Sequence, residues 1–366
     1  MAMRATRMVQ HGVCGAVRPP RSPVDFRWTY WSQSSSTRNK LHFKECALDQ
    51  RGASHRLHLY PQASIRINGR MLSRRHFLSA STFAAASFTL PTAYGEDERN
   101  IFQRLPQQVE ALEKASGGRI GVYALDTRTG TFAGHRENQL FPMCSTFKFL
   151  LASAVLKRVD EGKESLDHAL PIPRKPLVGH SPLTEPHAGA TMTVAALCHA
   201  ILNQSDNTAA NVLLEAIGGP PAITAFARSM GDAFTRLDRT ETDLNSSIDG
   251  DPRDTTTPAA MAMNLQRILL GNVLKPASRR QITEWMENCL SGLERLRKDI
   301  PEGWRAADKT GSNGEHTTND IAVLWPTHRA PVIVTCYITQ CPGPETKRGA
   351  MIAEVGRYVR EAILLG

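Results

Sequence analysis

The sequence predicts an α+β fold, in which helices flank an antiparallel five-stranded sheet and an all-helical part is inserted between its strands. From residue 98 onward, strand-like segments occur only near the two ends of the chain, and helical patterns dominate the middle. No helix separates the last three strand-like segments, so these strands should pair as antiparallel neighbours. We therefore expect one domain over residues 96–366, with the sheet part built from residues 98–144 and 291–366 and the helical part spanning about residues 145–290.

The first expected elements are a helix and two strands. Apolar side chains recur at helical spacing between residues 98 and 116, and Gly117-Gly118 then favour a stop. These apolar residues are Ile101, Leu105, Val109 and Leu112. The segments 119–125 and 130–134 follow and predict two strands around a polar turn.

Helices should form most of the middle of the chain. Periodic apolar segments predict helices at residues 147–159, 194–202, 208–217 and 259–270. Strands are expected at residues 304–309, 319–325 and 332–339, followed by a closing helix at 345–365. Because both ends of the chain contribute to the sheet, the cleft between the sheet and the helical part is the expected place for a site.

Positive charge is concentrated at the front of the chain. The formal net charge is +9, but residues 1–70 contain 12 Lys/Arg and 3 Asp/Glu, whereas residues 96–366 contain 30 basic and 32 acidic residues. Sequence-independent binding to nucleic acid needs clustered cations that displace counterions from phosphates. The nearly neutral body of the chain therefore predicts no nucleic-acid partner.

The segment from Met71 to Gly95 has the three parts of an export signal, namely a charged head, a modestly apolar middle and a small-residue end. Its head, Ser73-Arg74-Arg75-His-Phe-Leu, is similar to a twin-arginine signal, so we expect the twin-arginine translocation machinery as a partner. An apolar middle of roughly a dozen residues is too short to span a membrane. We therefore expect cleavage near Gly95, a periplasmic protein and no stable membrane anchor; an amphipathic surface helix is the alternative interpretation.

Residues 1–70 show no sustained periodicity and mix Ser, Arg, Gly and Pro in short runs, so they predict a disordered segment rather than a domain. An export signal works at an N-terminus, and Met71 directly begins the signal-like segment. Our hypothesis is that translation starts at Met71 and that residues 1–70 are a spurious extension. Any peptide from this segment detected in cells by mass spectrometry would contradict it.

The segment Cys144-Ser145-Thr146-Phe147-Lys148 places a hydroxyl and an amine three residues apart at the start of an apolar helix. Residues at this spacing share a helical face. A serine hydroxyl is a weak nucleophile until a base takes its proton, and a partly buried lysine with a lowered pKa can act as that base. Alone, the pattern more often indicates a helix-capping serine followed by a surface lysine.

Two further short motifs carry suitable chemistry. In Ser205-Asp206-Asn207, a second serine can pass a proton to a departing amine, and the asparagine amide can hold a substrate carbonyl. In Lys309-Thr310-Gly311, a cation and a hydroxyl on a strand edge suit a carboxylate, and the glycine lets a substrate approach the backbone. Alone, the first motif could be a helix cap and the second an ordinary turn.

In this order and spacing, the three motifs resemble those of the penicillin-recognising serine enzymes, and specifically the class A β-lactamases. The resemblance covers nearly all of residues 98–364. It includes the segment from Arg239 to Asn245 together with Asp254, which is similar to the loop that holds a hydrolytic water in class A enzymes. The resemblance implies that Glu241 and Asn245 hold this water, and that Arg239 and Asp254 form the ion pair that closes the loop.

For the reaction, the resemblance implies hydrolysis of the β-lactam amide bond of penicillins and cephalosporins by two-step acyl transfer, which confers antibiotic resistance. Ser145 would attack the lactam carbonyl with Lys148, or Glu241 through water, as the base, and this choice stays open. Ser205 would help to protonate the departing nitrogen, and Glu241 would then activate water to free Ser145. No metal or other cofactor is required, and the protein is expected to be a monomer.

The resemblance also assigns the residues that bind the substrate. Backbone N–H groups of Ser145 and Ser312 would hold the oxyanion. Lys309, Thr310 and Arg295 would receive the substrate carboxylate, because the strand after Gly311 carries no arginine for this purpose. The complete set of expected substrate-binding residues is Asn207, Asn245, Lys309, Thr310, Gly311, Ser312, Arg295 and, at a gatekeeper position that could equally be rim packing, His180.

Other functions would use part of this machinery: a penicillin-binding D,D-peptidase, a β-lactam sensor that is acylated without turnover, or a serine-type glutaminase. The segment from Glu241 to Asn245 argues against them, because a carboxylate beside an amide that shares its water is what deacylation requires. Turnover of a chromogenic cephalosporin by the purified mature chain would discriminate between them. Stoichiometric acylation without turnover would contradict the hydrolase prediction.

Overall fold

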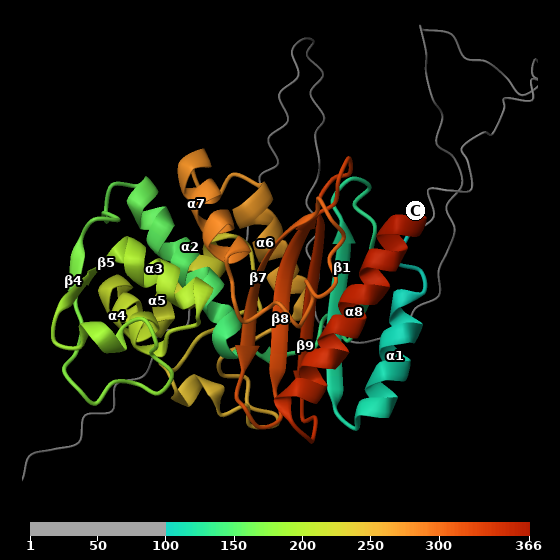
Figure 1. The fold of residues 1–366 in the computed structure, drawn as a ribbon, viewed down its shortest axis with the longest axis horizontal. Helices are drawn as coiled ribbons and strands as arrows, with labels where there is room; N and C mark the ends of the chain where they lie inside the picture. The colour runs from blue at the N-terminus through green and yellow to red at the C-terminus, as the bar shows by residue number, and fades with distance from the viewer. Residues whose placement is uncertain (1–99) are drawn as a thin grey trace, which may run out of the picture. The chain divides into compact units, whose positions relative to one another are not determined.

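The computed structural model describes residues 100–366, and the expectations for the export signal and for residues 1–70 lie outside the described residues. Five strands form one antiparallel sheet in the order β2-β1-β9-β8-β7 (Figure 1). They are β1 (Arg119–Asp126), β2 (Phe132–His135), β7 (Arg305–Ser312), β8 (Thr318–Trp325) and β9 (Val332–Thr339). The α+β fold and its five-stranded antiparallel sheet are thus confirmed.

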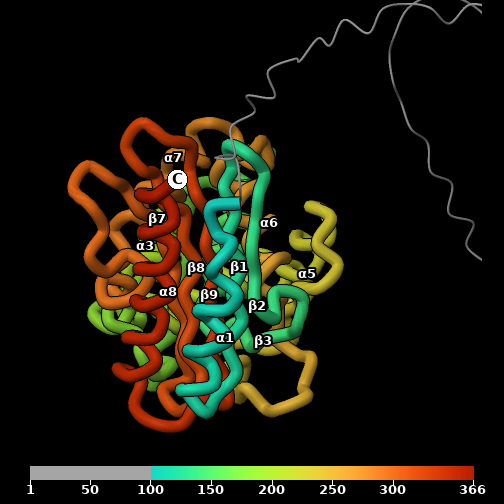
Figure 2. The backbone as a smooth tube through the Cα atoms, turned by 90° about the vertical axis from the view of Figure 1, so that its right-hand side faces the viewer, coloured from blue at the N-terminus to red at the C-terminus, as the bar shows by residue number. Residues whose placement is uncertain are grey.

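Two helices, α1 (Leu105–Ser116) and α8 (Glu345–Leu365), cover one face of the sheet. Figure 2, turned toward these helices, shows them side by side over the strands. Alternate residues of β1, such as Ile120 and Val122, pack into the apolar layer beneath them, while Tyr123 and Leu125 pack on the opposite face. Every residue of the central strand β9 is buried, because helices cover both faces of the sheet there.

The other face of the sheet packs against the helical part of the chain. Its helices are α2 (Phe147–Asp160), α3 (Val194–Asn203), α4 (Asn207–Ile217), α5 (Pro220–Ser229), α6 (Pro258–Leu265), which continues as a π-helical turn to Leu270, and α7 (Pro276–Glu287). Helix α2 lies at their centre: its first ten residues are buried, and it contacts α3, α4, α5 and α7. The N-terminal end of this buried helix meets β7 and β8 through the short 3-10 helix η3 (Cys144–Thr146).

Two predicted boundaries were wrong by three residues or more. The first helix begins at Leu105 rather than at residue 98, because Pro106 has no N–H and is accommodated only in the first turn of a helix. Strand β7 does not end at Lys309 but continues to Ser312, where Gly311 pairs with Asn319 and Ser312 with Thr318. The third motif therefore lies within a strand and not at its end.

Short extended segments complete the fold. Strands β3 (Phe141–Pro142) and β6 (Thr255–Thr256) pair beside η3, and β4 (Ala169–Pro171) pairs with β5 (Thr191–Thr193) at the edge of the helical part. They are too short for a periodic signal in the sequence. Within residues 100–366, no helix combines the length and the apolar character needed to cross a bilayer.

Candidate active site

Ser145 lies in η3, directly before α2, so that Lys148 follows it one helical turn later. The Lys148 side chain is completely buried, and its Nζ lies 3.0 Å from Ser145 Oγ. Burial lowers the pKa of Lys148, and the Glu241 carboxylate, 2.8 Å from Nζ, opposes this shift. The geometry is that of a nucleophile with an amine base in direct contact.

Lys148 connects the first motif to the second, and Ser205 of the second motif in turn contacts the third. Its Nζ donates to the main-chain oxygen of Ser205 at 2.7 Å and to Asn207 Oδ1 at 2.5 Å, and lies 3.3 Å from Ser205 Oγ. On its other side, Ser205 Oγ accepts a hydrogen bond of 3.1 Å from Lys309 Nζ. Side chains more than 150 positions apart in the sequence thus form one hydrogen-bonded network.

Asp206 fixes the turn that carries Ser205 and Asn207. Its buried carboxylate caps α4 by accepting from Ala209 N, and it also accepts from the main chain of Leu183 and from Thr184 N and Oγ1. Ser205 itself has a φ of +60°, a conformation that is uncommon for a residue with a side chain. The fully satisfied Asp206 holds this turn, and thereby aims both neighbours at Lys148.

The loop from Arg239 to Asp254 brings Glu241 to the network. Glu241 Oε1 lies 3.5 Å from Ser145 Oγ, and Oε2 accepts a hydrogen bond of 2.6 Å from Asn245 Nδ2. The main chain of Glu241 is held on both sides by Asn211 of α4, with Glu241 N donating to Oδ1 at 2.9 Å and Nδ2 donating to Glu241 O at 2.8 Å. Asn211 belongs to none of the motifs in the sequence, although it lies one helical turn after Asn207 on the same face of α4.

The ion pair that closes this loop is present and nearly buried. Arg239 Nε lies 2.5 Å from Asp254 Oδ2, and Asp254 Oδ1 accepts from the main-chain N–H groups of Asp238 and Arg239. Asp254 is 1% exposed, so a change that removes its charge takes away the nearer counter-ion of Arg239 and leaves the guanidinium with Asp251 alone, at 3.7 Å.

We therefore expect Asp254→Asn to lower the free energy of unfolding by about 3 kcal/mol, the usual cost of breaking a buried ion pair. It should also slow release of the acyl group more than its formation, since Glu241 and Asn245 lie on the same loop. Urea unfolding and pre-steady-state kinetics would measure the two effects. Arg253→Ala, which breaks the exposed pair with Asp251 in this loop, is the control and should change stability little; equal effects of both variants would contradict the prediction.

The third motif lies on the edge strand β7. Lys309 is completely buried, its Nζ also donates to Thr310 O at 2.7 Å, and burial lowers the pKa of Lys309 to about 8. Thr310 Oγ1 lies 2.5 Å from Ser291 Oγ, a contact that the sequence analysis did not anticipate. A Cβ on Gly311 would lie 2.7 Å from Met143 O and 3.2 Å from Ser145 N, so only glycine lets β7 pass this close to the backbone of Ser145.

A cavity of about 610 Å³ opens beside these groups, between the loop and the β7–β8 hairpin. Its lining residues are Arg239, Thr242, Asp243, Asn245, Ser246, Ser312, Asn313 and Glu315. Two of the expected substrate-binding residues, Asn245 and Ser312, thus face the same space. Ser145 is not among its lining residues, so this cavity is a candidate for the outer part of a substrate cleft.

The structure places the remaining two expected substrate-binding residues at the margin of the network. His180 is exposed; its Nε2 donates to Gln204 O at 2.9 Å, and its main-chain oxygen accepts from Asn207 N at 3.0 Å. Arg295 is buried beside β7, where Nη1 donates to Gly311 O at 3.2 Å and to the main chain of Asn319 at 2.8 Å. Arg295 is close to the third motif but already has protein partners.

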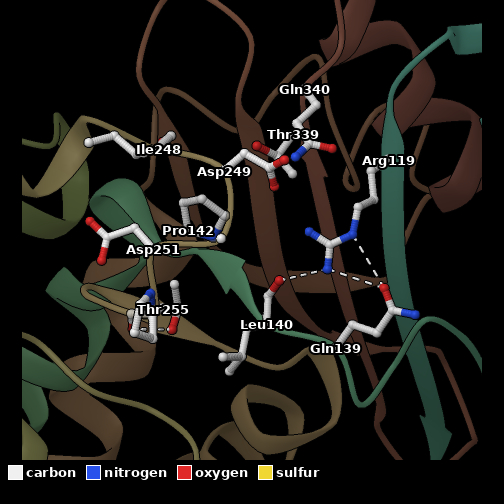
Figure 3. Close-up of a pocket in the computed structure, with 13 residues that line it drawn as sticks. Arg119, Gln139, Leu140, Pro142, Ile248, Asp249, Asp251, Thr255, Thr339 and Gln340 are labelled. Atoms are coloured by element: carbon white, nitrogen blue, oxygen red, sulfur yellow. Dashed lines mark hydrogen bonds between the residues drawn. The ribbon is translucent and has the colours of Figure 1, made fainter.

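A second cavity, of about 440 Å³, lies between the start of β1, strand β3 and the end of the Arg239–Asp254 loop (Figure 3). Arg119 borders it and donates to Gln139 Oε1 and Leu140 O. None of the expected site residues lines this cavity. It is therefore separate from the candidate active site.

Cys144, the neighbour of Ser145, does not have the chemistry of a reactive thiol. Burial raises the pKa of its thiol to about 12, so the reactive thiolate is not formed at neutral pH. Its Sγ lies 3.7 Å from Ser247 Oγ, which links η3 to the loop. Within the described part of the chain, this thiol and the four other cysteines are free.

Comparisons with known proteins identify the family of this chain. Residues 104–363 match the family model described as the beta-lactamase enzyme family. The chain is similar to Beta-lactamase L2 of Stenotrophomonas maltophilia (48% identity, 80% of this chain and 100% of the relative) and to Beta-lactamase Toho-1 of Escherichia coli (45%, 69% and 87%). Among solved structures it is similar to an ancestral class A β-lactamase (57% identity, TM-score 0.69, 70% of this chain and 99% of that chain) and to a β-lactamase from Xanthomonas campestris pv. campestris (45%, 0.70, 72% and 99%).

Proposed function

Because this chain belongs to the beta-lactamase enzyme family, and within it to the class A serine β-lactamases, we propose that Ser145 is its nucleophile. The chain hydrolyses the amide bond of β-lactams and thereby confers resistance to these antibiotics. The observation that carries the assignment is the contact of 3.0 Å between Ser145 Oγ and Lys148 Nζ, inside a network that also contains Ser205, Glu241 and Lys309.

In the acylation step, Lys148 takes the proton of Ser145 Oγ as this oxygen attacks the lactam carbonyl. A buried amine with a lowered pKa suits this role, and the amine is in direct contact with the hydroxyl. The proton then passes to Ser205 Oγ, 3.3 Å from Lys148 Nζ, and from there to the departing nitrogen. The backbone N–H groups of Ser145 and Ser312 receive the oxyanion, because Gly311 lets β7 lie close to Ser145.

In the deacylation step, Glu241 removes a proton from water, which attacks the acyl carbon and releases Ser145. Glu241 Oε1 lies 3.5 Å from Ser145 Oγ, so a water bound to this carboxylate is near the ester. Asn245 Nδ2 fixes the other carboxylate oxygen at 2.6 Å. This arrangement favours a hydrolase over a D,D-peptidase or a sensor, whose acyl-enzymes do not need a dedicated base for water.

In this proposal the substrate carboxylate binds to Lys309, Thr310 and Arg295, and His180 and Asn207 also contact the substrate. The pKa of Lys309, about 8, then has a consequence for catalysis. Below that pH the ammonium is present and attracts the carboxylate; above it the charge is lost. We therefore expect kcat/KM, which reports ionisations of the free enzyme, to fall as the pH rises through about 8.

A matched variant tests whether Lys309 causes the fall in kcat/KM at alkaline pH. Lys309→Arg keeps its positive charge at every accessible pH, because the guanidinium does not deprotonate in this range. Whatever its absolute activity, this variant should lose the fall in kcat/KM near pH 8. An unchanged alkaline limb in Lys309→Arg would assign the ionisation to another group.

Initial rates with a penicillin and with a chromogenic cephalosporin test the proposed substrate range directly. Multiple turnovers of both classes are expected, and a single stoichiometric burst would favour the sensor or peptidase alternatives.

We further propose that the chain acts as a monomer in the periplasm, after export by the twin-arginine machinery and cleavage near Gly95. Cell fractionation and the molecular mass of the mature protein in solution would test these points.

A further inference from the structure

Arg295 forms an ion pair with Glu345, the first residue of α8. Arg295 Nη2 lies 2.7 Å from Glu345 Oε1, and this is the one ion pair of Arg295 within residues 100–366. The two side chains differ in their exposure, which is 10% for Arg295 and 40% for Glu345. A nearly buried cation beside β7 thus has a counter-ion that remains in contact with water.

Other carboxyl groups near Arg295 do not cancel its charge. Asp320 is completely buried on β8, and burial together with the neighbouring Asp308 raises its pKa well above the usual range. Asp308 is in turn paired with Arg297. Among the described residues, Glu345 is the carboxylate that lies within ion-pair distance of Arg295.

The positions of Arg295 and Glu345 relative to β7 connect this ion pair to the substrate. Arg295 Nη1 donates to Gly311 O, and Gly311 directly follows the hydroxyl of Thr310 in the proposed carboxylate site. A substrate carboxylate that binds to Thr310 therefore comes close to the Arg295 guanidinium. Nη1 of this group already donates to main-chain oxygens, and Nη2 is bound to Glu345. The substrate carboxylate and the Glu345 carboxylate then compete for the N–H donors of the Arg295 guanidinium.

We propose that Glu345 determines how tightly this enzyme binds the carboxylate of its substrates, by competing with them for Arg295. The inference rests on the proposed function, in which Arg295 receives the substrate carboxylate. It adds a residue from the closing helix, 50 positions further along the chain, to the determinants of specificity. Glu345 acts here as a positioning and charge-tuning residue and takes no part in the chemical steps.

Glu345→Gln separates the charge of this side chain from its geometry. The glutamine amide oxygen still accepts a hydrogen bond from Arg295 Nη2, but the competing negative charge is gone. We expect KM for a penicillin to fall by roughly twofold to fivefold with kcat unchanged, the size of effect that a partly exposed ion pair supports. The gain should shrink at high salt, and it should be absent for the methyl ester of the same penicillin, which has no carboxylate.

The control is Glu354→Gln, on the same helix, where the exposed carboxylate pairs with Arg357 instead. It should leave KM for both the acid and the ester unchanged. Arg295→Ala should raise KM for the acid. Adding Glu345→Gln to this variant should have no further effect on KM, because the guanidinium for which the two carboxylates compete is gone.

The outcomes distinguish the inference from the function on which it rests. If Arg295→Ala leaves KM for the acid unchanged, Arg295 does not receive the carboxylate, and both the assignment and the inference fail. If Arg295→Ala raises KM but Glu345→Gln leaves it unchanged or raises it too, then Glu345 only supports Arg295. The inference is overturned in that case, while the proposed function stands.

Discussion

The Glu241→Ala variant is expected to be acylated by β-lactams but to release the acyl group about 10²- to 10⁴-fold more slowly, the usual contribution of a general base. Glu241 is the carboxylate that contacts both Ser145 Oγ, at 3.5 Å, and Asn245 Nδ2, at 2.6 Å. Without it, a water near the ester has no group to take its proton. The nucleophile keeps its contact with Lys148, so the first step should survive.

Intact-protein mass spectrometry after mixing with a penicillin would measure this result, since the adduct should persist in Glu241→Ala and be absent at steady state from the parent. Asp249→Ala is a suitable control, because Asp249 lies in the same loop but lines the separate cavity of Figure 3. Parent-like turnover of Glu241→Ala would refute the assignment of the base for deacylation. If acylation collapsed as well, Glu241 acting through water, and not Lys148, would be the base in the first step.

Much of the fold could be predicted because the sheet is buried on both faces. Strand β9 has the predicted bounds, residues 332–339, since a strand covered on both sides consists of an unbroken run of residues suited to burial. The first helix was placed seven residues too early, because the apolar spacing continues through Ile101 while Pro106 decides where the helix begins. Spacing reports which face is buried, whereas the backbone chemistry of single residues sets the ends.

The residues of the candidate site also fall into two groups, those that the sequence could predict and those that it could not. Ser145, Lys148, Ser205 and Lys309 could be proposed because each lies in a short motif, and the structure joins them in one network. Residues that act across the fold gave no such signal. Asn211 holds Glu241 from 30 positions away, Ser291 contacts Thr310, and Glu345 pairs with Arg295.

These contacts depend on which helix or strand packs beside which, and no local pattern in the sequence encodes that. Arg295 is an example, because the sequence indicated this residue and its charge but not Glu345, the carboxylate with which it forms an ion pair. A motif therefore identifies groups that can react, while the tertiary structure determines how strongly each is charged and how tightly it is held.

The Lys148→Ala variant should lose acylation and stability together. Lys148 Nζ contacts Ser145 Oγ and is the base in the proposed mechanism, so its removal should lower kcat/KM by about 10³-fold or more. It is also the ion-pair partner of Glu241, whose side chain is completely buried. Leaving that carboxylate without its counter-charge should lower the free energy of unfolding by about 3 kcal/mol. The rate of adduct formation and urea unfolding curves would measure the two losses.

A second substitution separates the chemical loss from the structural one. In Lys148→Ala combined with Glu241→Ala, no buried charge is left unpaired, so part of the lost stability should return, while acylation should not. Lys157→Ala, on the same helix but partly exposed and paired with Glu161 at 3.6 Å, is the matched control and should affect neither property by much. If the double variant recovered the acylation rate along with stability, Lys148 would be a structural residue, and the base for Ser145 would have to be sought elsewhere in the network.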